Sequence, residues 1–419
     1  HILKGTHLHL MAHRRKCVER RAADTLDPDA FVVGMRFRHS LWADDEQPTL
    51  AAIDAVTGEQ PVALSSADMH CGWVNSAAAR RLGVHVDESG LVGELEWFNA
   101  YTAFDKAPGA AEETDRLLRE AEQDAASKGV VGIRDYEMAE NIDTWINRFA
   151  AGINGLRVDA GVYPERLRAA IDAGWHTGKE LPGSAGLGHV GAMKLISDGS
   201  LNTRSAYCST PYSGIEPLTY GTLSYTPQQI EDYMRLATEH GFDIACHAIG
   251  DEANTIALNA VAATHAHGSI EHAQMLKPVD IPRFAELEGT AVADPYWHFK
   301  EPQYWESKES PALGERAEKM YPMKSFVDAG VTLVSASDFP VTSNPNPFYA
   351  MRTLVDGKPY DVPDITDMDD PAYLLWPEER VDIKRMIRSF TADAAWALSL
   401  DGETGSLEEG KAADFIVVD

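Results

Sequence analysis

Five residues of the types that bind metal ions stand at similar places in this sequence. His7 and His9 flank a leucine near the end of a short apolar run. His247, His272 and Asp338 each stand at or near the end of another such run. Alternate side chains of a strand share a face, so the first two imidazoles are expected to point the same way. Because neutral imidazoles with a carboxylate suit Zn²⁺ or a similar divalent ion, the pattern predicts one metal centre built from distant segments.

Lys194 belongs to a fifth run, in the sequence Ala-Met-Lys-Leu. A lysine that points into a core is costly if it stays charged and unpaired. One interpretation is a buried ion pair with Asp198. The other is that the amine, deprotonated by burial, has taken up CO₂ and become a carbamate that bridges two metal ions. The residues alone leave both interpretations open.

Eight short runs of β-branched or apolar residues could position these side chains, and amphipathic segments separate them. The runs are Leu3–Leu10, Val130–Tyr136, Leu156–Val162, Val190–Ser197, Phe242–Ile249, Ser269–Met275, Thr290–Trp297 and Val331–Asp338. Several lack polar alternation, which is typical of strands buried on both faces. Strands that alternate with helices predict a parallel sheet. Eight of them predict an α/β fold, a (β/α)₈ TIM barrel with its functional site at the C-terminal ends of the strands.

Local signals support helices between the runs. Thr226 and Gln229 form a capping box around a proline at the first helical position, and the amphipathic stretch that follows ends at Gly241. Ala111–Lys128 and Asp251–His265 are also predicted to be helical.

Two regions depart from simple alternation. The barrel is expected to span residues 1–398, with a long insertion of about 32–108 after strand 1 that lies over the active site. Residues 399–419 include Asp414–Val418, which has the composition of one more strand. A lone strand needs a partner. We therefore expect the C-terminal strand of a small β-sandwich domain, a remnant whose N-terminal part is absent.

Composition narrows the class of protein. The chain has 419 residues and a formal net charge of −28, which argues against binding to nucleic acid. No apolar run approaches the roughly 18 residues of a membrane span. Four scattered cysteines indicate neither a disulfide framework nor a thiolate zinc site. We expect a cytoplasmic protein with a small-molecule substrate, and the sequence leaves a homodimer open.

The sequence resembles the amidohydrolase superfamily, in the branch that contains the N-substituted formamide deformylases. The resemblance covers almost the whole chain. The motifs that carry it are Gly5–Leu10, Met193-Lys194 with Asp198–Leu201, His247–Asp251, Ile270–Gln274, Ala336–Asp338 and the closing Gly405–Asp414. Their combination is specific for the superfamily, and it does not identify a substrate.

The resemblance implies a metal centre and a reaction. The metal ligands implied are His7, His9, Lys194, His247, His272 and Asp338. One or two divalent ions, Zn²⁺ above all, would bind there, with Lys194 carboxylated on its side-chain nitrogen. The implied activity is cleavage of a non-peptide, amide-type carbon–nitrogen bond by a metal-activated hydroxide. Asp338 would be the general base that passes the proton to the leaving amine.

Further residues lie in segments that resemble the family around its substrate. His70, Trp73 and Asn75 belong to an insertion segment that could reach over the active site or could pack on itself. Asp198 and Arg204 are candidates for substrate binding, although an arginine in a polar loop is often only a salt-bridge partner. Asp251 and Glu271 are expected behind the ligands, and Asp251 could instead cap the following helix.

Two other functions remain open from the sequence. The first is a heterocycle deaminase of the same fold, which commonly uses one metal ion and a glutamate; Lys194 argues against it. The second is a non-catalytic barrel with a binding or regulatory role, which would not need six ligands. Ammonia as the product would indicate a deaminase, whereas a carboxylic acid and an amine would indicate an amidase.

Overall fold

In the computed structural model of the chain, the residues described are 31–39, 42, 46–101, 103, 110–301, 304–342, 344–359, 367 and 370–418. The chain divides into two units, His1–Leu118 and Arg119–Asp419, and each is considered by itself. The predicted first strand, Leu3–Leu10, lies outside the described residues.

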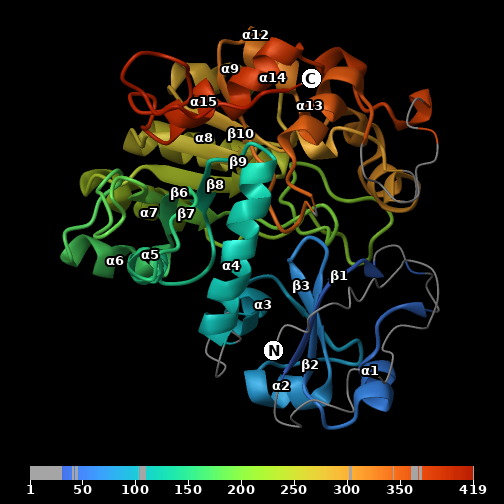
Figure 1. Ribbon diagram of the computed structural model, residues 1–419. Coiled ribbons are helices and arrows are strands. Elements are labelled where there is room, and N and C mark those ends of the chain that lie inside the picture. The colour runs from blue at the N-terminus through green and yellow to red at the C-terminus, as the bar shows by residue number, and fades with distance from the viewer. Residues whose placement is uncertain are drawn as a thin grey trace. The chain divides into compact units, whose positions relative to one another are not determined.

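The first unit is built on a four-stranded mixed sheet in the order β1-β2-β3-β4 (Figure 1). β1 and β2 are parallel, and the pairs β2–β3 and β3–β4 are antiparallel. Its elements are β1 (Val32–Phe37), α1 (Leu50–Thr57), β2 (Val62–Ser66), β3 (Cys71–Val74), α2 (Ser76–Leu82), β4 (Leu91–Gly93) and α3 (Glu94–Tyr101).

Trp97 on α3 fills one core of this unit and packs with Val74, Ala78 and Val92. It also explains Gly72 on β3, because a Cβ at that glycine would stand 2.1 Å from the Trp97 ring. Residues of the predicted insertion thus form a sheet with a core of their own. Its place after a first barrel strand and over the active site stays a prediction.

The second unit is built on seven parallel strands in unbroken chain order, from β5 to β11. They are β5 (Gly132–Asp135), β6 (Arg157–Val162), β7 (Gly188–Ile196), β8 (Ile244–Ala248), β9 (Gly268–His272), β10 (Thr290–Ala293) and β11 (Thr332–Ser335). Each lies within or beside one of the runs predicted from the sequence. β8 is buried at every position, as a strand covered on both faces must be.

Helices connect these strands. They are α4 (Ala110–Ser127), α5 (Asn141–Ala150), α6 (Pro164–Asp172), α7 (Pro227–Glu239), α8 (Asp251–Thr264), α9 (Ile281–Glu286), α11 (Ser310–Leu313), α12 (Met323–Asp328), α13 (Pro347–Asp356), α14 (Ile383–Phe390) and α15 (Ala392–Ala397). Short 3₁₀ turns occupy η5 (Pro295–Trp297), η7 (Gly314–Lys319), η8 (Pro371–Tyr373) and η9 (Pro377–Glu379), and η6 (Trp305–Glu309) is a π-helical turn. In Figure 1, α5 and α6 lie toward one end of the row of strands, and α9, α12 and α14 toward the other.

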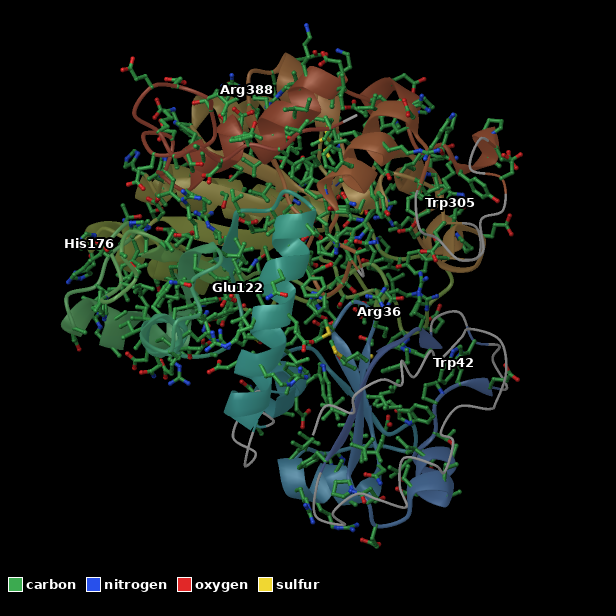
Figure 2. All side chains as sticks on the ribbon, in the orientation of Figure 1. Arg36, Trp42, Glu122, His176, Trp305 and Arg388 are labelled. Atoms are coloured by element: carbon green, nitrogen blue, oxygen red, sulfur yellow. The ribbon has the colours of Figure 1, made fainter. Side chains whose placement is uncertain are left out.

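Local contacts agree with the signals in the sequence. The capping box of Thr226 and Gln229 is present at the start of α7. On α4, Glu122 accepts a hydrogen bond from the backbone N–H of Gly155 at 2.7 Å, and Arg119 donates to the carbonyl of Ala151 at 2.8 Å. Figure 2 labels Glu122 on this helix. The C-terminal part of α4 is thereby fixed to the loop that precedes β6.

The sheet is curved, and its strands follow one another around it in chain order (Figure 1). This is the arrangement of an α/β barrel, in which each strand neighbours the next in sequence. The closing eighth strand was predicted in a segment outside the described residues, so closure of the barrel stays a prediction.

One prediction fails in the C-terminal segment. Asp414–Val418 form no strand in the part of the chain that the structure describes. Phe415, Ile416 and Val417 are largely exposed, and Asp414 pairs with Arg157 at 2.8 Å. An apolar β-branched run has the composition of a strand, but a strand forms only where another strand supplies hydrogen-bond partners.

Three of the four cysteines, Cys71, Cys208 and Cys246, are buried free thiols. Among the described residues, no helix combines the length and the apolar character that crossing a membrane requires.

Candidate metal centre

Three predicted ligands stand on neighbouring strands of the second unit. Lys194 is on β7, His247 on β8 and His272 at the end of β9. The strand register pairs Ile196 with His247 and Ala248 with His272, so the three side chains belong to the C-terminal part of the sheet. All three are buried, and the two imidazole rings meet edge to face with centroids 4.6 Å apart.

The ring of His272 is fixed by a carboxylate. Its Nδ1 lies 2.7 Å from Oδ2 of Asp294, which is itself buried. Since the carboxylate accepts, Nδ1 carries the proton and Nε2 keeps its lone pair. Burial lowers the pKa of His272, but the attraction of Asp294 outweighs burial and the net shift is upward. An imidazole held in this way is typical of metal-binding histidines, whose second nitrogen is bonded to a carboxylate or a carbonyl.

His247 is oriented in the opposite sense. Its Nε2 lies 3.3 Å from the carbonyl oxygen of Gly199 and 3.4 Å from Oδ1 of Asp198. Nε2 therefore donates, because both of these oxygen atoms can only accept. The two imidazoles thus use different ring nitrogens to bind their oxygen acceptors, a distinction that strand spacing alone does not reveal.

Asp198 has a structural task beside this histidine. Its carboxylate accepts hydrogen bonds from the backbone N–H groups of Tyr207, Ile249 and Gly250. Burial raises the pKa of Asp198 to about 7 against the effect of these three donors. The sequence placed this residue among the substrate contacts. In the structure it lies beside His247, and its contact with a substrate stays a prediction.

Lys194 is enclosed by the sheet. Its Nζ lies 4.7 Å from the centroid of the Tyr136 ring, and it forms no ion pair with Asp198 among the described residues. Burial lowers the pKa of this lysine, and the nearby carboxylates of Glu271 and Asp338 oppose that shift. Of the two interpretations of Lys194, the ion pair with Asp198 is therefore wrong within the described structure.

Asp338 follows β11 by three residues and is close enough to Lys194 and His272 to affect the pKa of each. Its backbone φ is 48°, and those of His272 and Ala273 are 69° and 38°. L-residues rarely adopt these left-handed angles, and such strain is concentrated at functional sites. The backbone departs from regular strand geometry where the side chains meet.

The described part of this centre is incomplete as a ligand cage. Within the described residues, no group of three or more His, Cys, Asp or Glu side chains is arranged to hold a metal ion. His7 and His9 lie outside the described residues, and Lys194 is not one of those four residue types. Lys194, His247, His272 and Asp338 therefore lie in one unit. Among the described residues, His247, His272 and Asp338 do not form a group arranged to hold a metal ion, so the six-ligand centre stays a prediction.

The remaining candidates of the second unit have other partners. Oε1 of Glu271 accepts from the hydroxyl of Ser269 at 2.5 Å and lies 3.4 Å from the Tyr136 hydroxyl. Asp251 is the first residue of α8, whose N-cap is Gly250, and it pairs with the backbone N–H of Ser209 at 2.8 Å. Asp251 is thus neither that cap nor bonded to His247 among the described residues.

Arg204 lies in the turn after Asp198, where its backbone φ is 59°. Its backbone N–H donates to the carbonyl of Leu201 at 3.1 Å. Its role in substrate binding stays a prediction.

The three candidates for substrate binding in the first unit, His70, Trp73 and Asn75, contact different kinds of partner. Nδ1 of His70 pairs with Oε2 of Glu94 at 2.9 Å. Trp73 packs edge to face against Trp42, with ring centroids 5.7 Å apart. Asn75 is the N-cap of α2, and the hydrogen bonds of its amide bind neighbouring backbone groups. That arrangement favours a structural role for Asn75, and contact of the other two with substrate stays a prediction.

Sequence reasoning missed residues that hold the ligands. Asp294 follows β10 directly, and a carboxylate at the end of a predicted strand was the same signal that pointed to Asp338. Tyr136 and Trp297 gave no such signal, because an aromatic residue in an apolar run is usually only part of a core.

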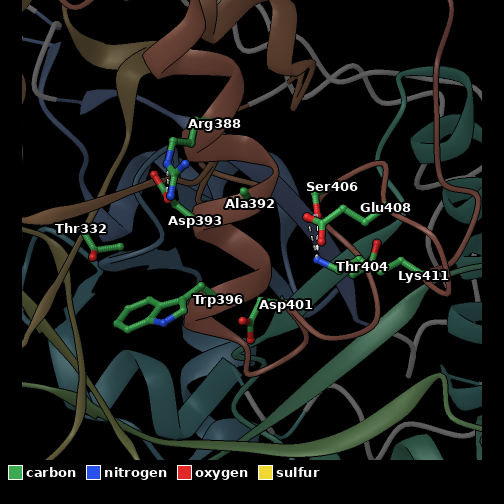
Figure 3. A pocket seen from close by; sticks show the side chains of 10 residues that line it. All are labelled: Thr332, Arg388, Ala392, Asp393, Trp396, Asp401, Thr404, Ser406, Glu408 and Lys411. Carbon is green, nitrogen blue, oxygen red and sulfur yellow. Dashed lines mark hydrogen bonds and ion pairs between the residues drawn. The ribbon is translucent and has the colours of Figure 1, made fainter.

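The second unit also has a pocket whose lining contains none of the predicted metal ligands. The pocket has a volume of about 380 Å³. Figure 3 shows the residues that line it, which come from α14, α15 and the 401–411 loop. Arg388 pairs with Asp393 at 2.8 Å, and Lys411 with Ser406 at 2.6 Å. The lining includes Thr332, the first residue of β11, so the pocket lies beside the N-terminal end of that strand. Barrel enzymes act at the opposite end.

Comparisons with known proteins place the chain in a family. The model of the amidohydrolase family matches residues 7–419. The putative amidohydrolase YtcJ of Bacillus subtilis is 24% identical over 459 residues, covering 99% of this chain and 82% of that protein. The N-substituted formamide deformylase of Arthrobacter pascens is 27% identical over 443 residues, covering 95% of this chain and 76% of that protein.

Two further likenesses are more limited. The protein LONG AFTER FAR-RED 3 of Arabidopsis thaliana is 33% identical over 239 residues, which cover 55% of this chain and 38% of the plant protein. An uncharacterized metal-dependent hydrolase from Pyrococcus horikoshii superimposes with a TM-score of 0.72 at 22% identity, over 93% of this chain and 77% of that one. The second likeness concerns the fold alone. The chain belongs to the amidohydrolase family, and this membership supports a metal-dependent hydrolase that acts on amide-type bonds.

Proposed function

We propose that this protein hydrolyses a non-peptide, amide-type carbon–nitrogen bond with one or two divalent metal ions, zinc above all. The ligands would be His7, His9, Lys194, His247, His272 and Asp338. The single observation that carries the proposal is the orientation of the two described imidazoles. Nδ1 of His272 is bonded to the carboxylate of Asp294, and Nε2 of His247 faces the carbonyl oxygen of Gly199. Metal-binding histidines are typically oriented by such an oxygen acceptor on one ring nitrogen.

The donor set fits zinc. Imidazole nitrogen and carboxylate oxygen are ordinary zinc ligands, and they come from several strands, as in other barrel enzymes. When bound, the ion supplies an activated water and polarises the carbonyl oxygen of the substrate.

We propose a carboxylated Lys194 as a bridge between two ions. A buried lysine with no ion pair among the described residues is poorly suited to remain a cation beside a metal site. A carbamate on Nζ would replace that cation by two oxygen ligands.

Asp338 is the proposed general base. Its charge raises the pKa of both Lys194 and His272, so it lies near them. A carboxylate at that place can accept a proton from water. It then returns that proton to the leaving amine nitrogen, so that the products are a carboxylic acid and an amine.

Product analysis tests the proposal. Zinc-loaded protein would be incubated with a panel of N-substituted formamides, the substrate type in the name of one relative, and with other small amides, carbamates and lactams. We expect one amide-type substrate to yield equal amounts of acid and amine. Release of ammonia from a heterocycle would indicate a deaminase instead. Zinc-replete protein that turns over none of these compounds would favour a binding role.

A further inference from the structure

The segment that follows β10 holds His272 from two directions. Asp294 immediately follows the strand, and η5 (Pro295–Trp297) follows Asp294. The carboxylate of Asp294 binds Nδ1 of His272 at 2.7 Å. The indole of Trp297 is stacked over the same imidazole, with ring centroids 6.0 Å apart and planes inclined by only 13°.

These two contacts belong to one closed turn. The backbone N–H of Trp297 donates to the carbonyl of Asp294 at 3.0 Å, so the backbone that carries the indole and the carboxylate is closed into a turn. Asp294 is 2% exposed, and a carboxylate so deeply buried needs the hydrogen bond that His272 gives it.

We infer that Asp294 and Trp297 form a clamp that sets the tautomer and the ring plane of His272 for metal binding. The inference rests on the proposed function, because it assigns a task to residues around one proposed ligand. Both are positioning residues. Neither is assigned to the metal or to the substrate.

The two halves of the clamp do different work. The hydrogen bond to Asp294 places the proton on Nδ1, which leaves Nε2 as the donor atom. A ring held by one hydrogen bond can still pivot about it. The parallel indole removes that freedom, since tilting the imidazole would separate two stacked faces.

Control of the plane matters because of the neighbouring residues. His272 has a backbone φ of 69°, and Ala273 has one of 38°, so regular strand geometry ends at His272, the last residue of β9. The regular pleat therefore does not aim the side chain. A metal–nitrogen bond is directed along the lone pair in the ring plane, and partners behind a ligand typically contribute 10- to 100-fold to metal affinity.

The test compares zinc affinity in matched variants. Metal-free protein would be titrated with zinc in competition with a chromophoric chelator, and the thermal midpoint of the metal-free form would be recorded in parallel. Trp297→Leu removes the stacked face, Trp297→Phe retains an aromatic face, and Trp175→Leu is the control. Trp175 is a partly buried tryptophan of the same unit, and its ring contacts Lys179.

We expect Trp297→Leu to raise the zinc dissociation constant about tenfold or more. Trp297→Phe should stay within about threefold of wild type, and Trp175→Leu should match wild type. The thermal midpoint of metal-free Trp297→Leu should change no more than that of the control. If Trp297→Leu fails to fold, Asp294→Asn carries the test, with the same expected loss of zinc affinity. Wild-type zinc affinity in Trp297→Leu, or in a folded Asp294→Asn, would overturn the clamp.

One more variant separates this inference from the proposed function. His272→Ala should lose zinc more severely than either clamp variant. If His272→Ala keeps full zinc content, the proposed ligand set itself is wrong. If His272→Ala loses zinc while the clamp variants bind it as the wild type does, only the clamp is wrong.

Discussion

At the scale of the residue, the hydrogen-bond acceptor that faces each histidine shows which ring nitrogen donates, and the position of the histidine in a strand does not. Asp294 accepts from Nδ1 of His272, whereas the carbonyl of Gly199 faces Nε2 of His247. The sequence predicted both histidines because each ends an apolar run. It could not predict the acceptors, because their contacts depend on loops that come together only in the fold.

Asp338→Asn should abolish turnover and leave the fold intact. The amide keeps the shape of the side chain but cannot accept the proton from water. We expect kcat to fall by roughly 10³-fold or more, as for other general bases. Steady-state kinetics with a circular dichroism spectrum as the folding control would check this. More than about a tenth of native activity in a folded variant would remove Asp338 from the role.

Lys194→Ala should lose zinc and activity together if the lysine is a carboxylated bridge. A short carboxylic acid such as propionate could occupy the space and restore part of both. An unmodified lysine predicts the reverse, because removing a cation would not weaken metal binding. Zinc content with and without propionate decides between them.

His298 presents a different residue-scale problem, because it lies beside the clamp with no exposure to solvent. Neither of its ring nitrogens has a hydrogen-bond partner among the described residues. Burial lowers the pKa of His298 to about 4, against an ordinary value of 6.5. Between these values the unfolded chain binds the proton and the folded protein does not, so stability falls as pH drops from about 6.5 to about 4.

His298→Phe should therefore flatten the acid side of the stability profile. The expected difference between variant and wild type across that window is roughly 3 kcal/mol of unfolding free energy. Urea denaturation at pH 7 and at pH 4.5 would measure it. An unchanged pH dependence in the variant would show that His298 is partnered in solution.

At the scale of the element, the runs and helices were predictable where their pattern is local. The capping box of α7 and the buried strand β8 follow directly from residue type and spacing. The strand expected at Asp414–Val418 did not form in the described residues, because its formation depends on a partner strand and not on its own composition.

Asp198→Asn tests how much the hydrogen bonds between the segment after β7 and the segment after β8 stabilise the fold. Asp198 follows β7 and binds backbone groups of Ile249 and Gly250 after β8, as well as Tyr207. An asparagine retains one acceptor oxygen and brings an NH₂ group toward donors, so these bonds cannot all persist. We expect the free energy of unfolding of the metal-free protein to fall by about 1–3 kcal/mol. A variant as stable as wild type would show that these hydrogen bonds add little.

At the scale of the whole molecule, the sequence predicted the parallel order of strands that the structure shows in the second unit. The four predicted ligands outside the first strand belong to that unit, and their binding of a metal ion stays a prediction. It could not predict that residues 32–101 would form a mixed sheet with its own core, because the runs there are short and their pairing is non-local. His7 and His9 remain predicted ligands, and the proposed set of six ligands is complete only with them.

The most direct test of the central claim is anomalous diffraction at the zinc edge from crystals grown with zinc and bicarbonate. The account predicts an anomalous peak about 2.1 Å from Nε2 of His272 and from Nδ1 of His247, the usual zinc–nitrogen distance. It also predicts density for a carboxyl group on Nζ of Lys194. Fully occupied zinc bound elsewhere, with these two nitrogens left without a ligand, would contradict it.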